Sequence, residues 1–402
     1  MRPSAITPLG GQMGIAFKSS ERATLGVEWE LQLVDRSSRH LRQEAQELLS
    51  ELPDLSAGGD GPPLRHELMQ SQVEVVTGIC ETVEDAKLDL TRNIDRMRDV
   101  LEPRGTTLTC SGTHPIDDWR DQSFSPGERY GELVEQMQWL ARRILTCGVH
   151  VHVGVRSQEK AIPMVNALAK FLPHFLALSA SSPFWSGHDT GLASARSVVF
   201  GALPTSGPPP NLSGWSAFEE YLETLLRAGT IASIKEVWWD IRPHPDFGTV
   251  EIRMFDGIPT LREVGMAAAL CQSLVELFDH QLDRGYGLPN PPSWLVSDNK
   301  WRATRYGLDA RVITDGHGTT VPIRDDLYEL VRELRPIAAR LGCAEDLDLV
   351  SEILDKGASY ERQRAVVAEG GSLDDVVDML AAELRGGLAR AEVSVGDGAG
   401  AR

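Results

Sequence analysis

The chain has 402 residues and a formal net charge of −18, with 42% hydrophobic and 24% charged residues. These proportions are typical of a globular protein with an ample core, and no apolar run approaches the length of a membrane span. The acidic charge and the absence of a Lys/Arg-rich block argue against nucleic acid as a partner, because neutralising phosphates requires a basic surface. We therefore expect neither a membrane nor nucleic acid as a partner.

Two further features bear on the compartment. The first twenty residues contain no continuous apolar stretch and no cleavage pattern of an export signal, so we expect a cytoplasmic protein. The five cysteines are an odd number, widely spaced and without a CxxC pair, which argues against both a disulfide framework and a zinc–thiolate site. We predict that they are buried thiols.

The first predicted element is a strand over residues 25–34. Val27 and Trp29 alternate with Glu28 and Glu30, which is the period of a half-buried strand and places both glutamates on one face. A loop rich in glycine and proline follows at residues 55–63, and then an acidic segment at 65–74. A second strand, predicted over residues 72–77, carries Glu74 among valines.

A helix is predicted next. Thr82 and Asp85 resemble a capping box, and apolar residues keep one helical face as far as Leu101, before Pro103 and Gly105 end the helix. We predict a short strand at 108–111 and a helix over 128–146. The strand at 149–155 follows, in which four valines alternate with His150, His152 and Gly154; a third helix is predicted over 159–179.

The second half of the chain begins with a proline-rich segment. Residues 201–214 contain four prolines and predict a long loop, either a lid or a wall of the active site. A helix is predicted over 215–227, and a strand over 249–255 opposes Glu251 and Arg253 to aliphatic residues. Beyond residue 261 the pattern is helical. We predict a catalytic domain over 21–320, a helical region packed on it over 324–390, and a disordered tail over 391–402.

The four strands carry acids, histidines and an arginine on the face opposite their aliphatic residues. Taken singly, each has an ordinary explanation: solvated glutamates, a core histidine, or a salt bridge between Glu251 and Arg253. If the strands share one sheet, five carboxylates and a histidine lie on the same face and carry a large negative charge. Mg²⁺ or Mn²⁺ with oxygen ligands would neutralise this charge. Zinc is less expected without thiolates. Arginines from other segments could then clamp anionic oxygens: Arg196, Arg242, Arg253 and Arg305.

Several common signatures are absent from the sequence. There is no GxxxxGK[ST] loop, no GxGxxG after a strand, no GxSxG elbow and no HExxH. If the protein uses ATP, metals and arginines rather than a glycine-rich loop must hold the phosphates. The same cluster could also support a metal-dependent hydrolase of amides or phosphoesters, or remain in a degenerate enzyme that only binds a nucleotide or metabolite.

Seven segments together resemble the type 2 glutamate-cysteine ligase family, carboxylate-amine ligases of the glutamine synthetase-like superfamily. The resemblance extends in consistent order over about residues 21–385. It rests on TLGVEWE (24–30), ELMQSQVE (67–74), GTHP (112–115), GVHVHVG (148–154), WDIRP (239–243), GTVEIR (248–253) and RYGL (305–308). The resemblance implies an α+β fold in which a curved antiparallel sheet, flanked by helices, forms a funnel with Mg²⁺ on its floor.

The resemblance also implies roles for individual residues. The implied metal ligands are Glu28, Glu30, Glu67, Glu74, His150 and Glu251. The groups implied on the transferred phosphate are His152, Arg253 and Arg305. Arg196 and Arg242 are implied to hold a substrate carboxylate, and Lys235 and Trp239 to lie near the nucleotide or substrate. Some family members carry an acid where Gln70 stands, which leaves the number of metals open.

The implied reaction is an ATP- and Mg²⁺-dependent ligation. The side-chain carboxylate of L-glutamate attacks the γ-phosphorus of ATP to give γ-glutamyl phosphate, and an amine such as L-cysteine then displaces phosphate. A different amine, used in specialised metabolism, would leave the mechanism unchanged. The superfamily resemblance also favours a homodimer or a higher homo-oligomer.

Overall fold

The computed structural model describes residues 8–9, 12–21, 23–56 and 63–396. At its centre is a seven-stranded sheet with the strand order β10-β11-β7-β3-β5-β4, and β6 also pairs with β3. All of these pairs are antiparallel. The strands are β3 (Leu25–Asp35), β4 (Leu64–His66), β5 (Gln72–Val76), β6 (Thr106–Thr109), β7 (Gly148–Gly154), β10 (Ile241–His244) and β11 (Thr249–Asp256).

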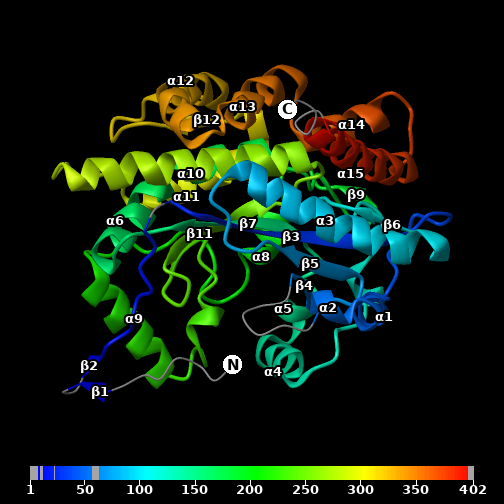
Figure 1. The fold of residues 1–402 in the computed structure, drawn as a ribbon, viewed down its shortest axis with the longest axis horizontal. Coiled ribbons are helices and arrows are strands. Elements are labelled where there is room, and N and C mark those ends of the chain that lie inside the picture. The colour runs from blue at the N-terminus through cyan, green and yellow to red at the C-terminus, as the bar shows by residue number, and fades with distance from the viewer. Residues whose placement is uncertain (1–7, 10–11, 22, 57–62, 397–402) are drawn as a thin grey trace, which may run out of the picture.

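Helices cover one face of this sheet. The long helices α3 (Val83–Leu101) and α10 (Leu261–Asp283) lie directly on it, and an outer layer packs on α10 (Figure 1). The outer layer consists of α12 (Ile323–Leu341), α13 (Ala344–Lys356), α14 (Ser359–Ala368) and α15 (Leu373–Gly396). The expected α+β class with an antiparallel sheet is confirmed.

Shorter elements flank the opposite face of the sheet (Figure 1). They include α9 (Trp215–Arg227) on one side, and α1 (Ala45–Glu51), α2 (Pro53–Ser56), α4 (Glu128–Met137) and α5 (Trp139–Arg142) on the other. Three further helices are α6 (Gln158–Leu168), α7 (Leu172–Ser179) and α11 (Ser293–Tyr306), with the short α8 at Ala195–Phe200. Two-stranded pairs complete the description: β1 (Pro8–Leu9) with β2 (Gln12–Met13), β8 (Phe184–Trp185) with β9 (His188–Asp189), and β12 (Arg311–Ile313) with β13 (Thr320–Pro322).

The strand β3 is the hub of the sheet. Its first half pairs with β7, its middle with β5 on the opposite edge, and its last residues with β6. Val27, Trp29 and Leu31 have no exposed surface and point into the core beneath α3 and α10. The alternation predicted from the sequence therefore separates a buried apolar face from a face that carries Glu28 and Glu30.

The predicted helix start at Thr82 is confirmed. The Thr82 hydroxyl accepts a hydrogen bond from the Asp85 backbone N–H at 3.1 Å, and Asp85 accepts one from the Thr82 N–H at 3.0 Å. This capping box satisfies two backbone donors that the first turn of a helix leaves unpaired. The helix α3 then buries its predicted apolar face, which includes Leu90, Ile94 and Met97.

Two predicted helices are interrupted. The helix predicted over 128–146 breaks at Gln138, where φ is 50°, and helical structure ends at Arg142. The helix predicted over 159–179 consists of α6, a 3-10 turn at Ala169–Phe171, and α7. Pro173 lies in the first turn of α7, where the missing N–H costs no intrahelical bond.

The segment Gln158–Ser179 also corrects the expectation about apolar runs. It is the one helical stretch of the described residues that is long and apolar enough to cross a membrane by length and composition. However, 83% of its most apolar window is buried inside the protein, because α6 and α7 pack against the sheet and against α10 and α11. These contacts identify it as part of the core.

Four other features differ from the sequence-based expectations. The short strand expected at 108–111 begins two residues earlier, as β6. The hairpin β12–β13 interrupts the region expected to be helical, and Gly318, with φ of 83°, lies in the turn between its two short strands. The tail expected to be disordered from residue 391 continues α15 as far as Gly396, and residues 397–402 lie outside the described part. Of the loop expected at 55–63, Leu55 and Ser56 belong to α2, and residues 57–62 lie outside the described part.

Candidate active site

The register of the sheet brings the predicted polar residues together. Residues directly opposite each other on antiparallel strands project their side chains to the same face. Glu28 lies opposite His150, and Glu30 lies opposite Glu74. A second row continues across the edge of the sheet, with His152 opposite Glu251 and Glu251 opposite Arg242. Residues that are up to about two hundred positions apart in sequence thus share one surface.

Three overlapping sets of side chains within this surface could hold a cation. In each set, one ligand atom per residue lies within 4.8 Å of the corresponding atoms of the others. The sets are Glu28, Glu74 and His150; Glu28, His152 and Glu251; and Glu30, Glu67 and Glu74. All six metal ligands predicted from the sequence belong to these sets, and His152 is an additional member.

Glu28 is the centre of the cluster. One of its carboxylate oxygens lies 3.0 Å from His150 Nδ1, and the other lies 3.8 Å from His152 Nε2. Burial opposes ionisation of Glu28, but the hydrogen bond with His150 and the nearby imidazole of His152 outweigh it and hold its pKa well below the usual value. Glu28 is therefore an anion at neutral pH. Glu30 is fixed nearby by accepting a hydrogen bond from the Gly148 backbone N–H.

Glu67 and Glu74 behave in the opposite way. Burial, reinforced by the charge of Glu30, raises the pKa of Glu67 to about 8. Burial and the charges of Glu28 and Glu67 raise the pKa of Glu74 well above its usual value. The protein alone therefore does not supply enough positive charge for these carboxylates, which is the electrostatic condition that a bound divalent cation relieves.

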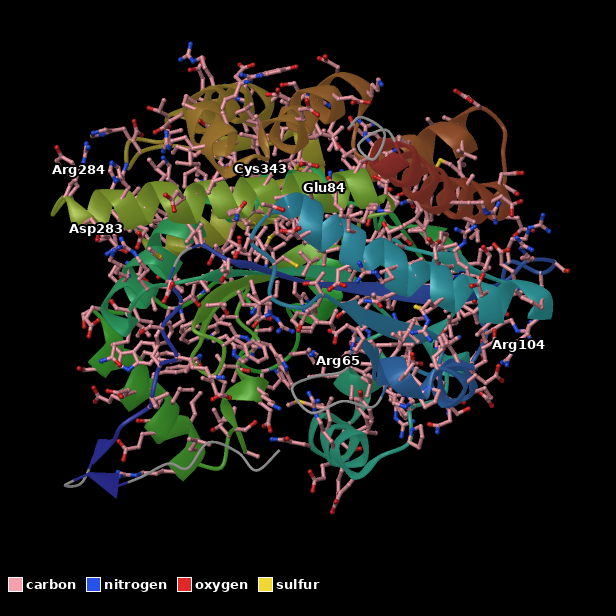
Figure 2. The ribbon with its side chains drawn as sticks, viewed as in Figure 1. Arg65, Glu84, Arg104, Asp283, Arg284 and Cys343 are labelled. Carbon is pink, nitrogen blue, oxygen red and sulfur yellow. The ribbon has the colours of Figure 1, made fainter. Side chains whose placement is uncertain are left out.

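Arg65 is a member of the site that the sequence did not reveal. Its Nη1 lies 3.3 Å from both Glu28 Oε1 and Glu74 Oε2, and Figure 2 shows it on the side of the sheet away from α3 and α10. Arg65 belongs to the three-residue strand β4, opposite Glu74. A strand this short has too few residues to display an alternation, so only its pairing with β5 identifies it.

Glu251 is enclosed by two arginines. Its carboxylate oxygens lie 2.7 Å from Arg242 Nε and 2.7 Å from Arg253 Nη1. Burial again opposes ionisation, but Arg242 and Arg253 hold the pKa of Glu251 well below its usual value. The charges of Glu251, Glu28 and Glu30 outweigh burial at Arg253 and raise its pKa, so it stays a cation.

A β-bulge shapes this end of the site. The register of β11 against β7 shifts between Ile252 and Phe255, so two residues of β11 face one of β7. Consequently Phe255 lies on the core face, where its ring packs 5.3 Å from that of Phe175, although simple alternation would place it on the polar face. Arg253 remains on the polar face beside Glu251.

The side chains of Arg253 and His152 each leave one buried nitrogen atom without a hydrogen bond to the described residues. Arg253 Nε and His152 Nε2 are buried and make no hydrogen bond with any described residue. The opposite nitrogen of His152 lies 3.0 Å from Thr249 Oγ1, which fixes the orientation of the ring. Because unpaired buried polar atoms are costly, these two atoms indicate a place where a polar ligand group can be accommodated.

Two of the predicted arginines make several hydrogen bonds within the protein, although the buried Arg196 Nε has no partner among the described residues. Arg196 is buried and donates to the backbone carbonyls of Met254 and Arg253, each at 3.3 Å, so it supports the bulge. Arg242 donates to Glu251 and to the carbonyls of residues 234, 235 and 237. Their role on a substrate carboxylate stays a prediction, and the structure adds a role in organising β10 and β11.

The remaining candidates lie apart from the carboxylates. Trp239 is buried in the core, with its ring 4.9 Å from Tyr221 and 5.9 Å from Phe218. Lys235 is exposed. Arg305 is exposed on α11, donates to the Gly191 carbonyl and lies 5.0 Å from the ring of Tyr306. Their roles near the nucleotide, the substrate or the transferred phosphate stay predictions.

Gln70, the position at which the sequence departs from some family members, also makes a hydrogen bond within the protein. Its Nε2 donates to the Phe124 carbonyl at 3.0 Å. The five cysteines are free and buried, as predicted.

The donor set fits a hard divalent cation. Carboxylate oxygens dominate, one or two imidazole nitrogens join them, and none of the described thiols belongs to the cluster. The raised pKa values of Glu67 and Glu74 and the unpaired His152 Nε2 are the observations that support this fit.

Comparisons with known proteins identify the family of this chain. The sequence model that describes glutamate-cysteine ligase family 2 matches residues 24–379 of this chain. A relative from Thermobifida fusca, provisionally named glutamate–cysteine ligase 2, is 73% identical over 93% of this chain and 94% of its own length. A similarly named relative from Frankia casuarinae is 56% identical over 93% of this chain and 98% of its own length.

Solved structures share the fold at low sequence identity. Glutamate–cysteine ligase from Francisella tularensis, in complex with AMP, has a TM-score of 0.65 and 11% identity, with 95% of each chain covered. A bifunctional glutathione synthetase from Pasteurella multocida has a TM-score of 0.61 and 15% identity, covering 92% of this chain and 53% of its own. On the match of the family model and the extent of these identities, the chain belongs to glutamate-cysteine ligase family 2.

Proposed function

We propose that this protein is an ATP- and Mg²⁺-dependent ligase that joins the side-chain carboxylate of L-glutamate to an amine such as L-cysteine. The single observation that carries the proposal is the convergence of the six predicted acidic and imidazole ligands on one sheet face. Family membership supports the ligase chemistry, and the AMP bound to the Francisella tularensis enzyme supports ATP as the nucleotide.

The residues proposed to hold Mg²⁺, or Mn²⁺, are Glu28, Glu30, Glu67, Glu74, His150 and Glu251. A divalent ion held there would neutralise negative charge on the triphosphate and on the reacting oxygens. Arg65 would keep Glu28 and Glu74 ionised and oriented while they serve as ligands, since it lies 3.3 Å from both.

Arg253 and His152 are the groups proposed to act on the transferred phosphate. Arg253 keeps its positive charge and presents an unpaired Nε, and His152 presents an unpaired Nε2. Donors that are already oriented before reaction stabilise developing charge at little cost of reorganisation. Arg305 is proposed to join them only if α11 or the substrate brings it closer, because its present contacts are with Gly191 and Tyr306.

The proposed reaction has two steps. A carboxylate oxygen of glutamate attacks the γ-phosphorus of ATP, the bond to the β,γ-bridging oxygen breaks, and ADP leaves, giving γ-glutamyl phosphate. The amine nitrogen then attacks the acyl carbon, loses a proton, and displaces inorganic phosphate to form the amide. We further propose that the protein works in the cytoplasm as a homo-oligomer.

The experiment is a coupled assay of ADP release with glutamate and a panel of amines, with products identified by mass spectrometry. We expect ADP release that requires glutamate, Mg²⁺ and one of the amines, and a product mass equal to glutamate plus that amine minus water. Absence of glutamate-dependent ADP release with every amine, from protein that binds Mg-ATP by calorimetry, would contradict the proposal. A hydrolase acting on amides or phosphoesters would instead need no ATP.

A further inference from the structure

The turn between β10 and β11 carries an exposed aromatic ring beside the site. Phe247 is 47% exposed, and its ring centroid lies 5.6 Å from that of His152. Other exposed aromatic side chains of the described residues include Trp139, Tyr286, Trp294 and Trp301, and none of these four has a ring contact with the polar face of the sheet. Phe247 therefore differs from these four residues in its position beside His152 and not in its degree of exposure.

One face of the Phe247 ring is already covered. The ring of His244 stacks on it with centroids 4.1 Å apart and an angle of 8° between the planes. His152 approaches both rings edge-on, 5.5 Å from His244 and 5.6 Å from Phe247. Because His244 covers one face of the ring while Phe247 as a residue is nearly half accessible, we infer that the opposite face and the rim of the ring are open.

The turn holds this ring in place before any ligand arrives. The backbone N–H groups of Phe247 and Gly248 donate to the His244 carbonyl at 3.2 and 2.9 Å, and the Lys18 N–H donates to the Pro245 carbonyl at 2.9 Å. Gly248 has φ of 68°, and a Cβ there would overlap the Lys18 carbonyl. The segment ending at Ser20 therefore packs tightly against the turn, and the ring is presented on a rigid support.

The chemistry of the reactants selects the ligand for this ring. Glutamate has no planar aromatic group, and neither has a small amine such as cysteine, whereas the base of a nucleotide has a π-face that stacks on aromatic side chains. His152 marks the place proposed for the transferred phosphate, and the Phe247 ring, 5.6 Å from it, is within reach of a nucleotide whose terminal phosphate binds there. Trp239, the aromatic residue expected from the sequence to lie near the nucleotide, is buried against Tyr221 and cannot offer a face.

We propose that the open face of Phe247 is the stacking surface for the adenine base of ATP. This inference rests on the proposed function, because it presupposes that a nucleotide binds with its phosphates at the sheet. Phe247 would then contribute to nucleotide affinity without contacting glutamate or the amine, while its ring keeps the edge-on contact with His152.

The test compares a ligand that carries a base with a polyphosphate that carries neither a base nor a ribose. Binding of Mg-ADP and of Mg-tripolyphosphate, which has no base, is measured by calorimetry on wild-type protein and on Phe247→Ala. We expect the Kd for ADP to rise about 10-fold, as the loss of one base–aromatic stack predicts, and the Kd for tripolyphosphate to stay unchanged. Phe247→Trp should restore ADP affinity, and Tyr286→Ala, which removes an exposed ring far from the sheet, should change neither Kd.

Other outcomes separate this inference from the proposed function. Unchanged ADP binding in Phe247→Ala, or an equal loss for ADP and tripolyphosphate, would overturn the stacking role while leaving the ligase intact. Failure of the wild-type protein to bind either ligand would overturn both. Circular dichroism checks that Phe247→Ala is folded; if it is not, Phe247→Leu keeps the bulk of the side chain, removes the π-face, and should show the same selective loss.

Discussion

At the scale of single residues, the site depends on acids that share one surface but differ in ionisation. Two histidines keep Glu28 charged and two arginines keep Glu251 charged, whereas Glu67 and Glu74 are driven toward their protonated forms by burial and by neighbouring carboxylates. A metal ligand must be deprotonated, so cation binding at this site must release protons.

The first prediction follows from Glu67. Because its pKa is raised to about 8, it holds a proton at pH 7 in the metal-free protein and loses it when Mg²⁺ binds. We expect calorimetry in buffers of different ionisation enthalpy to show net proton release at pH 7. Glu67→Gln should reduce that release by about one proton. Equal proton release by the variant and the wild type would contradict the assignment of Glu67.

The same shift predicts how stability depends on pH. A carboxyl group with a raised pKa in the folded state contributes stability that is fully present below its unfolded pKa, near 4.5, and is lost as the pH rises through about 8. We therefore expect the metal-free protein to lose thermal stability between pH 5 and pH 8 relative to Glu67→Gln. Added Mg²⁺ should raise the Tm of the wild type most at pH 8, and a stabilisation independent of pH would count against this explanation.

Glu251 gives the next prediction. Replacing it by Gln leaves Arg242 and Arg253 without their shared anionic partner in a buried position. Breaking such a pair costs about 3–5 kcal/mol, so we expect a loss of this order in the unfolding free energy from urea titration, and loss of ADP release. Glu84→Gln is the matched control, because Glu84 is half exposed on α3 and pairs with Lys87 on the surface, where a pair contributes little.

At the scale of elements, the contact between β7 and α8 determines how β11 presents Arg253. The Arg196 side chain passes over Gly148 and donates to the carbonyls of Met254 and Arg253 at the bulge. A Cβ at Gly148 would overlap the Arg196 guanidinium and lie 3.0 Å from the Phe255 carbonyl. A glycine is therefore required at position 148 because the Arg196 side chain lies too close for a Cβ, and not because the backbone has a positive φ.

This contact yields a paired prediction. Gly148→Ala should displace Arg196 and the bulge, with a stability loss of about 1–3 kcal/mol, which is typical of overpacking, and a lower kcat. Gly26→Ala on the neighbouring strand is the control, since its Cβ would only meet the His152 Cβ at 3.6 Å, an ordinary contact. Urea titration and the ADP assay on both variants check this. Equal effects of the two substitutions would contradict a specific role for Gly148.

At the scale of the whole molecule, residues of the C-terminal helices pack in the same hydrophobic core as the sheet. The helices α12 and α13 pack on α10, which packs on the sheet. Ion pairs connect the layers: Lys87 on α3 lies 2.8 Å from Asp346 on α13, and Arg362 on α14 lies 2.9 Å from Glu263 on α10. Removing these helices would expose the buried outer face of α10.

We therefore expect a chain that ends at residue 322 to be insoluble or unfolded, although it contains every predicted site residue. The intact protein should unfold in one transition, with coincident urea curves from tryptophan fluorescence and far-UV circular dichroism. Separate transitions, or a soluble and folded truncated chain, would indicate that residues 324–390 form an independent unit.

Much of the site was predictable from local patterns. The alternation in β3 and β7 placed Glu28, Glu30 and His150 on the face opposite the buried aliphatic residues, because the period of two is a property of the extended backbone itself. The resemblance to a ligase family added Glu67, which no alternation indicates. In the same way, Thr82 and Asp85 fixed the start of α3, because both partners of a capping box lie within one turn.

Other features depended on distant parts of the chain. Arg65 entered the site through pairing of a three-residue strand, Phe255 moved to the core face through a bulge, and Trp239 was buried by aromatic residues of α9. The sequence by itself determined which face of each strand is polar and which chemistry its residues can perform. Only the tertiary structure decided which strands are neighbours and in what register, because pairing between strands is set by non-local hydrogen bonds and packing that no local period encodes.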